Sequence, residues 1–237
     1  MNTELQNKHV ADLVKEYPRT ADVFRKVGID YCCGGKISLS EAVERCDFDS
    51  EEIFLEVESK VSQSSSEAGQ IDMKYLSIPS IIEYIQNRFH KDLKEELLNL
   101  TPFVERVAAR HGGTQPHLIA LHDLFEKFKA EMIAHTADED LNVFPLIVNY
   151  VDDSENVPVP EVKEAVRKLV DDHDTTGEIL MRMRKITEGY KLPENACGTY
   201  TLVYSRLEAL EKQTFEHVYM ENHALFERIA DLMTQHA

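Results

Sequence analysis

The sequence predicts an all-α protein in which a small N-terminal helical domain is followed by an antiparallel four-helix bundle. Residues that interrupt helices are scarce, since only 9 Gly and 8 Pro stand among 237 residues, well below the roughly 12% of an average protein. Apolar residues recur with the 3.6-residue period of a helix over long stretches of the second part of the chain. Long amphipathic helices joined by short connections are typical of a four-helix bundle, whose interior is a common place for metal sites.

The N-terminal domain is expected over residues 1–60 as three or four short helices. Apolar residues at 10, 13 and 14 begin one helix that Pro18 ends, and Thr20 begins another that runs to Val27, before Gly28. A loop with the sequence Asp-Tyr-Cys-Cys-Gly-Gly follows at residues 30–35. Ser40 is expected to cap the next helix.

A Ser-rich stretch separates the two domains. Residues 62–70 have the low-complexity composition of a flexible linker, so we place the linker at 61–74 and the bundle at 75–237. Helices are expected in the bundle over residues 79–100, 102–111, 116–150, 160–190 and 195–235. Turns are expected at 152–160 and 189–193 because helix-breaking residues gather there.

Charge and composition disfavour two classes of partner. The net charge is −17, from 26 Lys and Arg against 43 Asp and Glu, which disfavours nucleic acid and an anionic membrane surface. No apolar stretch approaches the roughly 20 residues of a membrane helix, and the first residues lack the regions of a signal peptide. We therefore expect a cytoplasmic protein, in which the 4 Cys do not form a disulfide framework.

Two pairs of His and Glu are expected to face the bundle interior. His-x-x-x-Glu occurs four times, where about one chance occurrence is expected, and it places both side chains on one helix face. At about 100° per residue, His135 and Glu139 share the apolar stripe of their helix, as do His217 and Glu221. The other two pairs point away from it. Each inward Glu is followed by Asp or Asn and, four residues later, by Phe.

Two further histidines extend the inward pairs into a repeated arrangement. His90 and His173 lie on or beside apolar faces, 45 and 44 residues before His135 and His217. A single such His is more often a core residue, but this many buried polar groups without a metal would cost several kcal/mol. Four His and two bridging Glu suit two non-haem iron ions in an oxo- or carboxylate-bridged centre, with manganese as the alternative. Zinc normally takes four ligands per ion and would gain little here.

His111 is a seventh candidate ligand. Along one straight helix it would lie about 31 Å from His90, too far to share a site. If the chain reverses at Thr101 and Pro102, which form a good N-cap and first-turn pair, His111 returns to the level of His90. The residues alone leave both arrangements open.

Cys32 and Cys33 are adjacent in the Gly-rich loop. Neighbouring cysteines bond to each other only with strain, and the spacing differs from that of redox or zinc motifs. We expect an exposed pair on a mobile loop that exchanges a metal, NO or a disulfide, with two incidental thiols as the alternative. Cys46 and Cys197 are expected to be packing residues.

Together these features resemble the iron-sulfur cluster repair proteins of the RIC or ScdA/YtfE type, which join a short domain with an Asp-Tyr-Cys-Cys-Gly-Gly loop to a hemerythrin-like di-iron bundle. The resemblance covers nearly the whole chain. It implies that Cys32 and Cys33 are the reactive loop residues and that both Glu ligands bridge the irons. The metal ligands that it implies are His90, His111, His135, Glu139, His173, His217 and Glu221.

The resemblance also implies a cytoplasmic protein that tends to dimerise and repairs iron-sulfur clusters damaged by nitric oxide or oxidants. Its partners would be damaged iron-sulfur proteins, with NO or O2 as small ligands. Iron donation and NO removal are both compatible with the residues. Two other functions stay open, namely a reversible O2- or NO-binding sensor and an NO reductase or oxidase working at the di-iron centre.

Overall fold

The computed structural model describes residues 3–63 and 73–235, and the regular elements in these ranges are helices. The predicted all-α class is therefore confirmed. The chain divides into two compact units, with the boundary between Tyr75 and Leu76. Most of the predicted linker, residues 64–72, lies outside the described residues. No helix in the described part of the chain is long and apolar enough to cross a membrane.

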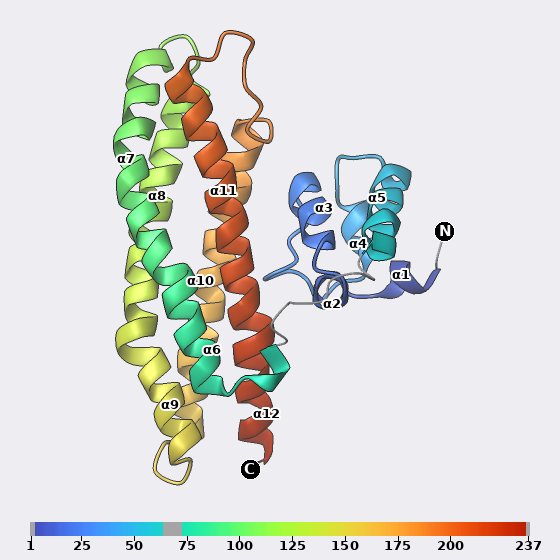
Figure 1. The fold of residues 1–237 in the computed structure, drawn as a ribbon, viewed down its shortest axis with the longest axis vertical. Coiled ribbons are helices and arrows are strands. Elements are labelled where there is room, and N and C mark those ends of the chain that lie inside the picture. The colour runs from blue at the N-terminus through green and yellow to red at the C-terminus, as the bar shows by residue number, and fades with distance from the viewer. Residues whose placement is uncertain (1–2, 64–72, 236–237) are drawn as a thin grey trace. The chain divides into compact units, whose positions relative to one another are not determined.

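The N-terminal unit is built from short helices (Figure 1). These are α1 (Thr3–Asn7), α2 (Val10–Glu16), α3 (Thr20–Val27), α4 (Leu39–Glu44) and α5 (Ser50–Gln63), with a 3₁₀ turn, η2 (Met73–Tyr75), after them. α3 ends at Gly28, whose left-handed backbone (φ 78°) suits glycine. Ser38 caps α4, since its Oγ accepts a hydrogen bond from the Glu41 N–H at 3.2 Å. The prediction that Ser40 is the cap was wrong because Ser40 lies inside α4 and donates to the Gln6 carbonyl.

The second unit is an antiparallel bundle of four long helical rods (Figure 1). The first rod is α6 (Ile78–Ile85), η3 (Gln86–His90) and α7 (Lys91–His111), and the second is α8 (His117–Asp138), η4 (Glu139–Val143) and α9 (Phe144–Asp152). The third is α10 (Val159–Ile186), and the fourth is α11 (Gly198–Met220), η5 (Glu221–Phe226) and α12 (Glu227–Gln235). The segments η3, η4 and η5 are π-helical turns. α7 and α10 each pack against both α8 and α11, as expected for the predicted bundle.

α7 continues through Pro102, where the sequence suggested a reversal. A proline inside a helix removes one hydrogen bond and costs about 3 kcal/mol. The apolar stripe nevertheless runs on from Leu97 through Leu100 to Val104, all at most 2% exposed. Burying a side chain of this size contributes about 1.5–3 kcal/mol, so tertiary packing outweighs the local signal to turn.

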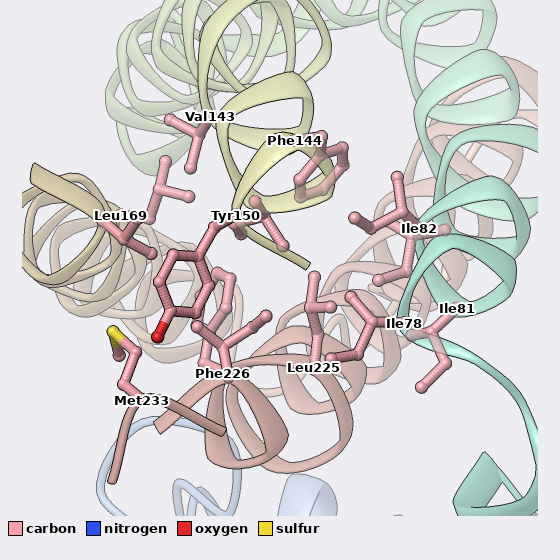
Figure 2. Close-up of a cluster of buried hydrophobic side chains, with 14 of the residues drawn as sticks. Ile78, Ile81, Ile82, Val143, Phe144, Tyr150, Leu169, Leu225, Phe226 and Met233 are labelled. Atoms are coloured by element: carbon pink, nitrogen blue, oxygen red, sulfur yellow. The ribbon is translucent and has the colours of Figure 1, made fainter. Parts of the chain in front are cut away.

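A cluster of buried apolar side chains fills one end of the bundle (Figure 2). Ile82 from α6, Phe144 and Tyr150 from α9, Leu169 from α10 and Phe226 from η5 are among its members, so every rod contributes. Three of these rods carry their π-helical turns beside this cluster. The cluster therefore fixes the rods against one another at the level where the buried His and Glu residues lie.

Candidate metal centre

Six buried polar side chains meet inside the bundle, and each was predicted as a metal ligand. They are His90, His135, Glu139, His173, His217 and Glu221, all at most 6% exposed. They form two groups in which every donor atom lies within 4.8 Å of the others. One group holds His90 and His217, the other holds His135 and His173, and both share Glu139 and Glu221.

The first subsite joins the first and fourth rods. The Nε2 atoms of His90 and His217 lie 3.0 Å apart. Glu139 Oε2 is 3.4 Å from His90 Nε2, and Glu221 Oε1 is 2.8 Å from His217 Nε2. Two imidazole nitrogens and two carboxylate oxygens therefore point at one small volume.

The second subsite repeats this arrangement between the second and third rods. The Nε2 atoms of His135 and His173 are 3.0 Å apart. The other oxygen of each shared carboxylate serves this side, with Glu139 Oε1 at 3.3 Å from His135 and Glu221 Oε2 at 3.1 Å from His173. Each carboxylate thus presents one oxygen to each subsite, which is the geometry of a bridging ligand.

Buried carboxylate oxygens that lack hydrogen bonds indicate that the cluster is suited to binding cations. Among the residues that the structure describes, both oxygens of Glu139, which is 0% exposed, and Oε2 of Glu221 have no hydrogen-bond partner. Leaving a buried acceptor unpaired costs about 1–3 kcal/mol, and more for a charged group. Each facing pair of Nε2 atoms also shares at most one proton. Cations between these donors would satisfy all of them, so the residues present fit a two-metal centre.

Two π-helical turns begin at the two shared carboxylates, and a third ends at a histidine of the cluster. η4 starts with Glu139, η5 starts with Glu221, and η3 ends with His90. A π turn adds a residue to the helical turn, so it shifts the side chains that follow it around the helix axis, and such turns are frequent at functional sites. The third rod has no such turn, and His173 reaches the site from the regular helix α10.

The residue after each shared Glu orients a histidine from a different rod. Asp140 Oδ1 lies 2.8 Å from His90 Nδ1, and Asn222 Oδ1 lies 3.0 Å from His173 Nδ1. An acceptor at Nδ1 keeps the proton there and leaves the Nε2 lone pair free for a metal. In the sequence, the signal for this role is the Asp or Asn that directly follows each inward Glu, a role that helical periodicity alone does not reveal.

The phenylalanine of the repeated pattern covers the same histidine. Phe144 stacks on His90 with ring centres 5.6 Å apart, and Phe226 stacks on His173 at 6.1 Å. In each half of the bundle, one rod therefore supplies an acceptor and an aromatic face that fix the imidazole of the other rod of that half. These contacts explain why the sequences after Glu139 and Glu221 both continue with an Asp or Asn and then a Phe.

The buried histidines and carboxylates of the cluster shift one another's pKa values. Burial lowers the pKa of His135, but the carboxylates of Glu139 and Glu221 outweigh this effect and raise it to about 9 from 6.5. The pKa of His90 is also raised, because the same carboxylates outweigh its burial. Burial raises the pKa of Glu221, yet the neighbouring imidazoles hold it well below 4.5. Glu221 thus stays ionised and attracts cations, and metal binding would release protons from the histidines.

His111 does not join this cluster, and its prediction as a ligand was wrong. It ends α7, about 30 Å along the helix from His90. Its Nε2 lies 3.4 Å from the Cys197 Sγ, and its ring centre is 5.6 Å from that of Tyr200. The reversal at Pro102 that would return His111 to the site does not occur. Cys197 is exposed, so its prediction as a packing residue was also wrong.

The Cys-Cys loop is more ordered and more buried than predicted. Cys32 is only 2% exposed and Cys33 is half-buried. Gly35 connects the loop to α2 through a hydrogen bond, because its carbonyl accepts the Ala11 N–H at 2.9 Å. A Cβ at Gly35 would lie 2.5 Å from the Tyr31 carbonyl oxygen, so only glycine fits. The expectation of an exposed pair on a mobile loop was therefore wrong for Cys32.

Family profiles match both units of the chain. A profile named ScdA_N, described as a domain of unknown function, matches residues 6–60. The profile of the hemerythrin HHE cation binding domain matches residues 82–229, and these residues include the whole His and Glu cluster. Fold and site together define a hemerythrin-like cation-binding bundle joined to a small helical domain.

Similar proteins extend the match to nearly the full chain. The iron-sulfur cluster repair protein ScdA of Staphylococcus haemolyticus is 42% identical over 221 residues, which are 93% of this chain and 97% of that protein. ScdA of Staphylococcus epidermidis is 40% identical over 224 residues, with the same shares of the two chains. YtfE of Pectobacterium carotovorum is 27% identical over 223 residues, or 94% and 96% of the two chains. The chain belongs to the ScdA/YtfE family of iron-sulfur cluster repair proteins.

Proposed function

We propose that this protein repairs iron-sulfur clusters damaged by nitric oxide or oxidants, and that a di-iron centre in its bundle carries this function. The observation that supports the proposal most directly is the pair of subsites that share both carboxylates. Similar proteins with matching length are named iron-sulfur cluster repair proteins. Damaged iron-sulfur proteins are the proposed partners.

The donor set favours two iron ions. Each subsite offers two imidazole nitrogens and one oxygen from each of two carboxylates, a mixed nitrogen and oxygen set that suits iron. We assign His90 and His217 to one iron, His135 and His173 to the other, and both Glu139 and Glu221 to the bridge. When bound, the irons supply redox chemistry and an open position for NO or O2, or they serve as cargo for a damaged cluster.

Access to the centre is proposed through a pocket beside His135. The pocket has a volume of about 270 Å³, and its lining includes Glu131, Asp138 and Asp172. Its carboxylates attract cations, and its size admits diatomic molecules. Asp172 Oδ2 also lies 3.8 Å from His135 Nδ1, so this pocket carboxylate faces the imidazole from beyond hydrogen-bond distance.

The Cys-Cys loop is proposed to take part in the transfer of iron or of NO. Cys32 Sγ and Cys33 Sγ lie 3.4 Å apart, so both thiols could contact the same iron ion or NO molecule. We propose the domain limits 1–60 and 75–237 with the linker at 61–74, a homodimer as the assembly, and the cytoplasm as the compartment. A gas-binding module would have no use for the thiols, which makes them the test of the repair role.

Reactivation of a damaged cluster tests the function. A dehydratase with a [4Fe-4S] cluster is inactivated with NO, and its recovery is followed after addition of the iron-loaded protein. We expect recovery with the wild type, and at least a tenfold lower rate with Glu139→Leu and with Cys32→Ser/Cys33→Ser. His122→Gln, which changes a histidine outside the cluster, is the matched control and should keep the full rate.

Three results would contradict this proposal. Equal recovery with Glu139→Leu would show that the bundle centre has no part in repair. Reversible uptake of NO or O2 by the reduced protein without any recovery of the enzyme would favour the sensor, and steady consumption of NO without recovery would favour the reductase.

A further inference from the structure

The N-terminal unit contains a second group of metal-ligating atoms, separate from the bundle centre. We infer that Asp30, Cys32 and Cys33 form a mononuclear site for a divalent transition metal of borderline softness, with Fe2+ and Zn2+ as the two candidates. One ligand atom from each residue lies within 4.8 Å of the others. The inference adds a metal to the transfer role proposed for the thiols, but binding itself does not depend on that role.

The two sulfur atoms and one carboxylate oxygen lie close enough together to bind one metal ion. Cys32 Sγ is 3.4 Å from Cys33 Sγ and 3.2 Å from Asp30 Oδ1. Two sulfurs at this separation can reach one ion at the 2.3 Å typical of zinc-sulfur bonds. Thiolates with a carboxylate suit zinc or ferrous iron, whereas magnesium and calcium prefer oxygen donors alone.

The loop holds this geometry before any metal arrives. Asp30 Oδ1 accepts the backbone N–H groups of Cys32 and Cys33, both at 2.9 Å, and Oδ2 accepts that of Gly34 at 3.1 Å. The carboxylate therefore fixes the backbone that carries both thiols. Gly35 fixes the other end of the loop on α2. Little ordering of the chain is left for binding to impose, and such preorganisation favours affinity.

Binding is a simple exchange of protons for a cation. Two thiols lose their protons to the buffer, two sulfur-metal bonds form, and the metal charge is balanced by the two thiolates. No electron is transferred. The alternative fate of the pair, a disulfide between neighbouring cysteines, needs an oxidant and strained geometry, and it is an outcome that the test detects.

Anaerobic titration with Co2+ tests the inference in the full-length, fully reduced chain. Cobalt reports thiolate ligation by a near-ultraviolet sulfur-to-metal charge-transfer band, and the bundle centre has no cysteine among its ligands. We expect the band to saturate with about one equivalent of Co2+ at the loop, and Zn2+ to displace it. Cys33→Ala and Cys32→Ser should each lower the affinity at least tenfold. Cys46→Ser changes a thiol of the same unit that donates to the Ala42 carbonyl, and it should leave the band unchanged.

Several outcomes would overturn the site. One is the absence of a charge-transfer band at any cobalt concentration up to millimolar, and another is a band that survives in Cys32→Ser/Cys33→Ser. Loss of both free thiols to a disulfide under reducing conditions also overturns it. Cys33 is half-buried, so Cys33→Ala retains the fold, and circular dichroism checks this. If cobalt binds as expected but Cys32→Ser/Cys33→Ser repairs clusters normally, the site stands and the transfer role fails.

Discussion

Replacing Asn222 tests whether the acceptors behind the histidines tune the metal centre. Asn222 Oδ1 is the acceptor 3.0 Å from His173 Nδ1. In Asn222→Ala the imidazole loses the partner that fixes its tautomer and its orientation. Loss of such a partner typically weakens metal affinity 10–100-fold, or about 1.4–2.7 kcal/mol. The same free energy disappears from the stabilisation that metal gives to the folded state, which lowers the melting temperature of the loaded protein by about 3–10 °C.

Competition with a chelating dye measures the affinity, and thermal unfolding with and without iron measures the linked stability. Asn142→Ala is the matched control, since that exposed amide donates to Asp138 and contacts no imidazole. Asn222→Asp should restore binding, because Asp140 serves His90 in the same way in the other half. Equal iron affinity in Asn222→Ala and the wild type would refute the reasoning.

Three further predictions concern other parts of the bundle. His111→Ala should retain the full metal content by elemental analysis, because His111 lies far from the cluster; loss of metal would contradict its placement. Glu211→Ala should destabilise the protein by about 3–5 kcal/mol in urea unfolding, because it leaves Arg184 without its buried partner at 2.7 Å; a change below about 1 kcal/mol would contradict this. In the metal-free protein, the raised pKa of His135 (about 9) makes a contribution to stability that is complete below pH 6.5 and is lost as the pH rises through 9. The free energies of unfolding from urea titrations at pH 6 and pH 9.5 should therefore differ by on the order of 3 kcal/mol, and by much less in Glu139→Gln.

Helical periodicity was enough to predict which six His and Glu side chains are buried together in the bundle. Residues four apart share a helix face whatever the tertiary details, so His135 with Glu139 and His217 with Glu221 had to turn together toward the core. Repetition of the pattern in both halves then placed His90 and His173. Burial in the structure agrees with this prediction for all six side chains.

Features that depend on contacts between distant segments were missed. Pro102 is a strong local signal to turn, but packing of α7 against α8 and α11 keeps the helix continuous and carries His111 away. The π-helical turns have no sequence signature at the level of apolar spacing. Burial of Cys32 follows from the approach of Gly35 to α2, which no pattern within the loop predicts.

The metal content of protein purified from iron-fed cells tests the central claim most directly. The account predicts about two irons per chain in the wild type, one for each subsite. Because Glu139 and Glu221 each serve both subsites, Glu139→Leu and Glu221→Leu should each lose both irons together. Less than about half an iron per chain in the folded wild type, or a full complement in either variant, would contradict a carboxylate-bridged di-iron centre.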